Sequence, residues 1–451
     1  MEIECFHRKI KELEGKSYRE EEVALYRAEI VLRIDLYRLS TSVAYTRISD
    51  VPRIDKMALV KLFESLGGHS WKRKFGWTGQ SQTSIKPAIG MFEAEAQLFD
   101  GVETSDKTVT ALKLTNNACE GELPGKIGDL SNLTTLYIDI NNLEGSLPHG
   151  LGRLEKLEFV NLSCNNLGGE IDERCLTKLR TLRILDLSFN KMTGELPDCF
   201  DSVTKLQDLN LSGNSFEGAL PNSMATLVNL RNLKMYSNNF SGPLPRFFMY
   251  FTNLLTINMS QNKFTGGLNQ LFSCVKLKRI SLSNNLLTEP LDGGISALQS
   301  LELLYLNGNS IGGRIPVGIC NLKFLKFINL SDNELVGALP EEFGNMSWLK
   351  LCTLSNNRLC GPIPSTISKL VNLRDFHIFT SSKSETMSLQ RAFTKHLFDR
   401  VYCWGTSVGI DNVTWELPTM DDIGNVFAAK KKPKSRSEYD DEDSESSDED
   451  S

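Results

Sequence analysis

The sequence predicts an α/β solenoid in which short, strand-containing coils stack around one elongated apolar core. The asparagine of the pattern L-x-L-x-x-N recurs at spacings of 23 to 25 residues along the chain. Glycine is frequent, with 33 residues, and aromatic residues make up only 8%, which suits many tight turns around an aliphatic core. Since a coil of this length cannot bury its own apolar face, successive coils are expected to stack and bury a continuous one.

Eleven units share this asparagine, which falls at the bend where each short strand ends. There the side-chain amide can satisfy backbone donors and acceptors of its own and adjacent coils, and it tolerates left-handed backbone angles. A twelfth unit, LRDFHIFTS, ends at Ser381, where the asparagine is expected. The predicted asparagine ladder consists of Asn117, Asn141, Asn165, Asn190, Asn214, Asn238, Asn262, Asn285, Asn309, Asn333 and Asn357.

The fifth unit, LNLSGNSFEGALPNSM from Leu209, shows what the other repeated positions do. Alternation at Leu209 and Leu211 predicts a short strand with these leucines pointing inward. Gly218 supplies a turn that a Cβ atom would strain. Leu220 then fills the core, and Pro221 directs the chain into an extended segment.

The full pattern, L-x-x-L-x-L-x-x-N-x-L-x-G-x-L/I-P, resembles the plant-type leucine-rich repeat of receptor ectodomains and of many protist proteins. The resemblance covers residues 109–381 and implies a curved solenoid of about 12 repeats with a parallel β-sheet on its concave side. At about 4.8 Å per strand, that sheet would be roughly 50 Å long. The family binds very diverse partners, so the resemblance implies binding without naming a ligand.

Residues 57–108 resemble the helical N-terminal cap that precedes such arrays. Thr104 stands where secreted relatives carry a cysteine, which favours an intracellular chain. Residues 1–56 are expected to form an amphipathic helical extension that packs on the cap, binds a partner or stays loosely ordered. The sequence leaves open whether Met1 or Met57 is the working start; a start at Met57 is expected to leave the cap whole.

Beyond the array, residues 382–425 are expected to form an irregular C-terminal cap with Trp404 and Trp415 shielding the last coil. Residues 426–451 are expected to be a disordered tail, first basic and then acidic. Its KKKPKSR block, 430–436, resembles a nuclear import signal. A merely solvated run of charge is the alternative.

Composition excludes several classes of function. The net charge of −6 comes from the tail, since residues 437–451 hold nine acidic residues, and no basic field suggests nucleic acid. No apolar run is long enough for a membrane span, and the charged N-terminus does not resemble a secretory signal. The ten cysteines lack CxxC pairing, which favours reduced thiols in a cytoplasmic, or alternatively nuclear, location.

No motif predicts catalysis. The G-x-S-x-G match at Gly405, Ser407 and Gly409 lacks a downstream histidine and the sheet that a nucleophile elbow requires. The five histidines are isolated, so no metal site is expected, and no cofactor is predicted. We therefore expect a protein that is not an enzyme.

The residues between the repeated leucines face outward and form the candidate site. Two apolar clusters flank a basic stripe, as in protein interfaces, although the apolar residues are equally consistent with packing between neighbouring coils. We expect a protein-interaction module or scaffold that binds a protein partner on its concave face, with signalling as one setting. The alternatives are a nuclear acidic-tailed adaptor for basic proteins and a soluble relative of secreted recognition receptors. The candidate binding residues are Tyr137, Phe159, Ile184, Arg231, Lys234, Lys278, Arg279, Leu303, Tyr305, Phe327 and Leu351.

Overall fold

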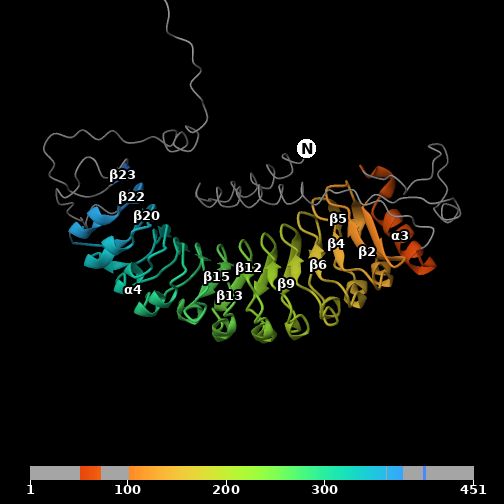
Figure 1. The fold of residues 1–451 in the computed structure, drawn as a ribbon, viewed down its shortest axis with the longest axis horizontal. Coiled ribbons are helices and arrows are strands. Elements are labelled where there is room, and N and C mark those ends of the chain that lie inside the picture. The colour runs from red at the N-terminus through yellow and green to blue at the C-terminus, as the bar shows by residue number, and fades with distance from the viewer. Residues whose placement is uncertain (1–50, 73–100, 362, 379–399, 403–451) are drawn as a thin grey trace, which may run out of the picture. The chain divides into compact units, whose positions relative to one another are not determined.

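A computed structural model describes residues 51–72, 101–361 and 363–378, and the backbone of 400–402 (Figure 1). All of these fall within one unit of the chain, Met1–Ser407. Most of the N-terminal extension lies outside the described residues. So do Trp404 and Trp415, Ser407 and the charged tail.

A 14-stranded sheet runs through the whole stack of coils and holds one strand from each repeat. Its first pair is antiparallel and every later pair is parallel. The twelve strands from β2 to β22 correspond to the twelve predicted repeats, which confirms the solenoid. In order, the strands are β1 (Val102–Ser105), β2 (Thr108–Lys113), β4 (Thr135–Tyr137), β6 (Phe159–Asn161), β8 (Ile184–Asp186), β10 (Asp208–Asn210), β12 (Asn232–Lys234), β14 (Thr256–Asn258), β16 (Arg279–Ser281), β17 (Leu303–Tyr305), β18 (Phe327–Asn329), β20 (Leu351–Thr353), β22 (Asp375–His377) and β23 (Arg400–Tyr402).

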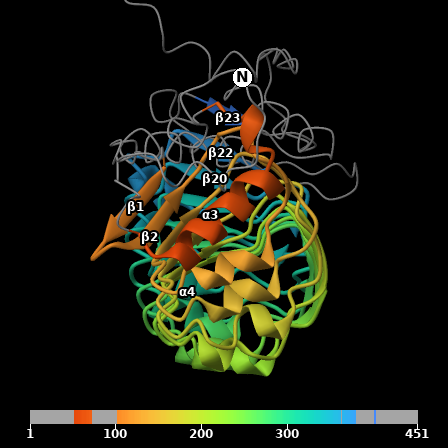
Figure 2. The ribbon, with the colours of Figure 1, turned by 90° about the vertical axis from the view of Figure 1, so that its right-hand side faces the viewer.

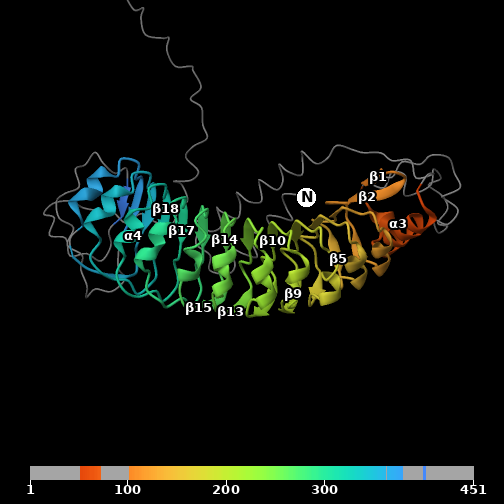
Figure 3. The same ribbon diagram turned by 60° about the horizontal axis from the view of Figure 1, so that its bottom comes forward.

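A second set of strands, after the bends, forms smaller parallel sheets along another side of the stack (Figure 3). One has the order β15-β13-β11-β9-β7, and the others pair β19 with β21 and β3 with β5. These strands are β3 (Glu120–Glu122), β5 (Asn142–Glu144), β7 (Gly168–Gly169), β9 (Lys191–Glu195), β11 (Ser215–Gly218), β13 (Asn239–Pro243), β15 (Lys263–Thr265), β19 (Val336–Gly337) and β21 (Arg358–Leu359).

Short helices close the coils on the side opposite the main sheet (Figure 1). Most begin after the proline of the Leu/Ile-Pro pair, which is extended as predicted; Pro221 has φ −68° and ψ 149°. One of them is an α-helix, α4 (Val317–Cys320); the other described α-helix, α3 (Arg53–Ser65), belongs to the N-terminal cap. The 3₁₀ helices are η2 (Gly68–Ser70), η4 (Gly125–Asp129), η5 (His149–Arg153), η6 (Glu173–Cys175), η7 (Phe200–Ser202), η8 (Asn222–Thr226), η9 (Arg246–Tyr250), η10 (Asn269–Leu271), η11 (Gly293–Ala297), η12 (Glu341–Asn345) and η13 (Ser365–Lys369).

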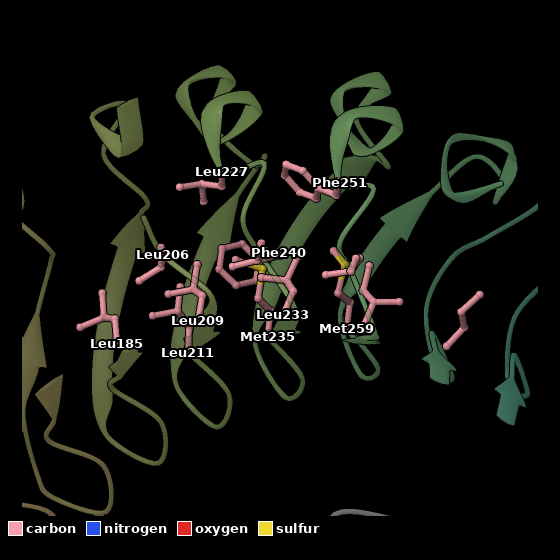
Figure 4. Packing of buried hydrophobic residues seen from close by; sticks show 14 of the residues in the cluster. Leu185, Leu206, Leu209, Leu211, Leu227, Leu233, Met235, Phe240, Phe251 and Met259 are labelled. Carbon is pink, nitrogen blue, oxygen red and sulfur yellow. The ribbon is translucent and has the colours of Figure 1, made fainter. Parts of the chain in front are cut away.

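The core is one continuous column of apolar side chains, because equivalent residues of successive coils lie in register. Leu209 is paired with Leu185 on one side and with Leu233 on the other, and all three are buried (Figure 4). Phe216, the inward residue after the bend, stacks on Phe240 with ring centroids 6.0 Å apart. Each coil thus covers the apolar face of its neighbour.

The cap helix α3 closes the N-terminal end of the column beside β2 (Figure 2). It begins at Arg53, before Met57, and the buried Asp55 in its first turn accepts a hydrogen bond from Val109 N–H at 3.1 Å. A chain starting at Met57 would lose this turn and this bond. The expectation that such a start leaves the cap whole is therefore wrong.

At the other end, the sheet continues past the last predicted repeat. β23 pairs in parallel with β22 and lies in the segment expected to be an irregular cap. Within the described residues, no helix has both the length and the apolar character needed to cross a membrane.

Candidate functional site

The asparagine ladder gives the sheet a fixed frame. In the fifth unit, Asn214 Nδ2 donates to Leu211 O of its own coil and to Leu187 O of the preceding coil, both at 3.0 Å. Its Oδ1 accepts the Met192 N–H of the preceding coil, also at 3.0 Å. The same arrangement recurs at each ladder position from Asn141 to Asn357. Each amide therefore ties two coils together.

One expectation about these asparagines is wrong. The left-handed backbone angle falls on the residue just before the ladder position, for example Gly213 at φ 66° and Ser237 at φ 55°, and not on the asparagine. Because the amide must reach carbonyls of two coils, the preceding residue makes the turn. Asn116, Asn284 and Asn356 occupy this turning position and suit it.

We call the outward side of the main sheet the concave face. The strand register places its outward residues in two straight rows. The first row contains Ala111, Thr135, Phe159, Ile184, Asp208, Asn232, Thr256, Arg279, Leu303, Phe327, Leu351 and Asp375. The second contains Lys113, Tyr137, Asn161, Asp186, Asn210, Lys234, Asn258, Ser281, Tyr305, Asn329, Thr353 and His377.

The N-terminal apolar cluster lies on three adjacent strands. Phe159 is in register with Ile184, and Tyr137 lies in the second row beside Asn161. All three apolar side chains are half-buried. Burial, and secondarily the Asp139 carboxylate, raises the pKa of Tyr137, so its phenol stays neutral. This cluster keeps apolar area open to solvent.

The C-terminal cluster is less exposed than expected. Phe327 and Leu351 are half-buried and in register, but Leu303 and Tyr305 retain only 8% and 5% of their accessible surface. Leu303 lies in register between Arg279 and Phe327, at the strand spacing of about 4.8 Å. Large neighbours at that spacing cover a side chain that points outward. For Leu303 and Tyr305 the alternative of packing between neighbouring coils therefore applies, and both side chains offer little surface to a partner.

The basic residues come from two coils that are separated by the coil of β14. Arg231, Lys278 and Arg279 are exposed, and Lys234 is half-buried. Lys278 and Arg279 lie close to Glu302, whose pKa is lowered first by a hydrogen bond from Lys326 and further by these two cations. The basic stripe therefore extends to Lys326 in the C-terminal coils, since all three cations lie near Glu302.

Polar pairs occupy the face between the two clusters. Ser188 Oγ donates to Asp186 Oδ1 at 2.6 Å, and Asn210 Nδ2 donates to Asp186 Oδ2 at 3.2 Å. Asn232 Nδ2 donates to Asp208 in the first row. The bonds from Asn210 and Asn232 cross from one strand to the next, and together with the bond within the Asp186 coil they fix the side chains of the central coils.

Two exposed aromatic residues at the edge of this face were missed by the sequence reasoning. Phe324 and Trp348 stand three residues before the first residue of β18 and β20, and are 54% and 50% exposed. The available signal was an aromatic residue in the same slot of two successive repeats, where other repeats carry Asn132, Lys156 or Asn253. The candidate residues lie within a strand or one residue before it, so the alternating pattern that identified them does not extend to this slot.

The described part of the chain shows no group of three or more metal-binding side chains. Its cysteines are all free thiols; seven are buried and Cys360 is exposed. Burial raises the pKa of Cys175 to about 11 and that of Cys274 to about 12, so both thiols remain protonated near neutral pH.

Comparison with known proteins agrees with the fold. A family model described as a leucine-rich repeat region matches residues 107–266, and a second leucine-rich repeat model matches residues 300–322, 324–346 and 348–370. Together these segments cover more than half of the 451 residues. Comparison with curated proteins finds no significant match.

Several solved structures are similar. The plant peptide hormone receptor RGFR1 in complex with RGF2 is 27% identical, with 66% of this chain and 51% of that chain covered and a TM-score of 0.60. The PEPR1–AtPEP1 structure is 25% identical, with 78% and 51% covered and a TM-score of 0.62. A plant ice-binding protein is 25% identical, with 70% and 98% covered and a TM-score of 0.56.

This chain spans about half the length of the two receptor chains that it matches. Leucine-rich repeats are typically non-enzymatic modules that bind proteins or, in plant receptors, peptides. The repeat spacing, the cross-coil asparagine bonds and the matching family models lead to one identification: the chain belongs to the leucine-rich repeat family and is of the plant type.

Proposed function

We propose that this chain is a non-enzymatic interaction module or scaffold that binds a protein partner on its concave face. The observation that carries the proposal is the half-buried apolar side chains at two places on one sheet, around Phe159 and at Phe327 and Leu351, with basic side chains between them. Aromatic anchors beside arginine are the usual strong contacts of protein interfaces. The asparagine ladder keeps these side chains in place, so little ordering is needed on binding.

The similar structures support a protein or peptide ligand. RGFR1 is described as a peptide hormone receptor in complex with RGF2, and the chain shares 27% of its residues over the matched region. A second candidate function, ice binding, comes from the plant ice-binding protein. The basic side chains between two apolar clusters on the concave face favour a protein ligand over ice.

We further propose a cytoplasmic setting, supported by the free thiols at every described cysteine. The nuclear adaptor and the soluble receptor relative remain the alternatives. Deleting 430–451 from a fluorescently tagged chain tests the adaptor: unchanged location and unchanged partners would remove it. Attached glycans or an oxidised cysteine pair in the isolated protein would instead favour the receptor relative.

The test of the binding face is proximity labelling in cells with full-length variants. Phe159→Ala combined with Phe327→Ala removes an anchor from each cluster and should weaken labelling of the main partners by about tenfold or more. Tyr305 is a poor choice for this test, because its burial makes loss of folding the expected result.

Met249→Ala combined with Tyr250→Ala is the matched control, since both side chains are exposed on η9, on the opposite side of the coils. Circular dichroism checks that each variant folds. Unchanged partner labelling by the Phe159/Phe327 variant, with folding intact, would overturn the proposed face.

A further inference from the structure

The exposed aromatic pair Phe324 and Trp348 forms a contact surface at the edge of the concave face. The following strand residues Phe327 and Leu351 are direct register partners, so the two aromatic residues stand at equivalent places in neighbouring coils. About half of each aromatic side chain is open to solvent. Adjacent large apolar side chains that remain exposed usually mark an interaction site.

A column of cations runs beside the aromatic pair. Lys350 N–H donates to Lys326 O, and Arg374 N–H donates to Lys350 O, each at 2.8 Å. Three basic residues therefore occupy successive coils at the strand spacing of about 4.8 Å, where like charges destabilise each other. An anion beside this column would relieve the repulsion.

The carboxylates of the described residues relieve only part of it. Lys326 Nζ lies 2.7 Å from Glu302 Oε2, whereas Lys350 and Arg374 have no ion-pair partner among the described residues. In the segments that lead into β17, β18, β20 and β22, the basic residues Lys323, Lys326, Lys350 and Arg374 outnumber the acidic residues Glu302 and Asp375, while Glu341 and Glu342 lie on the preceding helix η12. The edge is therefore complementary to an acidic ligand.

The adjoining part of the concave face adds apolar groups. Phe327 and Leu351 are half-buried between the aromatic pair and the second row. These two side chains are in register on adjacent strands, at the spacing of about 4.8 Å, so they form a continuous apolar floor beside the aromatic pair.

We propose that this edge, formed by Phe324, Trp348, Lys350 and Arg374, binds an acidic peptide segment of a partner protein. An apolar side chain of the segment packs on the aromatic pair, and its carboxylates pair with the two cations. The inference rests on the proposed function, which supplies the class of ligand, a protein. It adds the position of the binding surface and the acidic character of the bound segment. The aliphatic floor at Leu351 favours a peptide over single-stranded nucleic acid, for which bases would stack on the aromatic rings.

The experiment uses a phage-displayed library of random twelve-residue peptides, selected against the full-length protein. Enriched peptides should combine Asp or Glu with an aromatic or aliphatic residue. Phe324→Ala with Trp348→Ala, and separately Lys350→Glu with Arg374→Glu, should each lower the binding of enriched peptides by about tenfold or more. Binding should also weaken as salt rises.

Matched controls separate this edge from general surface effects. Lys205→Glu changes an exposed lysine in the slot equivalent to Trp348, and Tyr250→Ala removes an aromatic side chain of similar exposure. Both controls should leave binding unchanged. Circular dichroism again checks folding.

Three results would overturn the inference: no enrichment, enrichment of neutral or basic peptides, or an oligo-dT strand that binds through the same four residues. The proposed function has a distinguishable outcome. The Phe159→Ala, Phe327→Ala variant could abolish peptide binding while the two edge variants, at Phe324 and Trp348 and at Lys350 and Arg374, leave it unchanged. That result would support the concave face as the binding site and exclude the edge.

Discussion

Replacing one ladder asparagine should cost far more stability than replacing the asparagine beside it. Asn238 donates through Nδ2 to Leu211 O at 3.0 Å and to Met235 O at 3.1 Å, and its Oδ1 accepts Phe216 N–H at 3.0 Å. Asn238→Ala leaves the buried N–H of Phe216 without its acceptor. It also removes the donor that the carbonyls of Leu211 and Met235 share. An unsatisfied buried group costs about 1–3 kcal/mol and a lost hydrogen bond about 1 kcal/mol, so we expect a loss of about 2–4 kcal/mol.

Asn239→Ala is the control, because this neighbouring asparagine is exposed and belongs to no ladder position. Its effect on the free energy of unfolding should stay within about 0.5 kcal/mol. Urea denaturation followed by circular dichroism measures both variants. Amide exchange read by mass spectrometry should show the loss of protection centred on the coils of Phe216 and Asn238, since each coil of a solenoid contacts only its neighbours.

Unfolding of the two alanine variants at the same urea concentration, with the same slope, would contradict a stabilising role of the ladder amide. In that case the backbone groups at the bend would find other partners, and the amide would be dispensable. A uniform loss of protection along the whole array would contradict the local character of the bonds instead.

Two further predictions concern a turn and a thiol. Gly218 has φ 75°, and a Cβ atom there would lie 2.7 Å from Glu195 Cγ. Gly218→Ala should therefore lower the free energy of unfolding by about 1–3 kcal/mol in urea denaturation. Gly125→Ala, with open space around the new Cβ atom, should stay near wild type. Burial raises the pKa of Cys274 to about 12. At pH 8 maleimide should therefore label the exposed Cys360 much faster than Cys274. Equal labelling rates of the two thiols, measured by peptide mapping of the native protein, would contradict this.

The fold could be predicted because each repeated position has a local physical role. Leu209 must point inward, Gly218 must turn and Pro221 must extend, and the structure places each of them so. The beginning of the cap was harder to predict. The position of Asp55 depends on a hydrogen bond to Val109, which is distant in sequence, and no periodicity reports such a contact.

The candidate site could be predicted only in part, because the direction in which a side chain points does not determine how much of it is exposed to solvent. Alternation correctly places Leu303 and Phe327 in one outward row, yet Leu303 is buried and Phe327 is half-buried. How much of an outward side chain remains open depends on the sizes of the residues in register on both sides. That register exists only once the coils are stacked.

Phe324 and Trp348 illustrate the converse. They lie outside the alternating stretch, so a strand pattern says nothing about them, and their exposure follows from the path of the chain as it enters the sheet. Yet the ladder that holds Asn333 and Asn357 also fixes these two slots relative to each other. An apolar substitution at such an edge slot costs the solenoid little, because the core and the ladder carry the stability. The edges of the sheet are therefore places where a solenoid of this kind can acquire a binding surface without changing its fold.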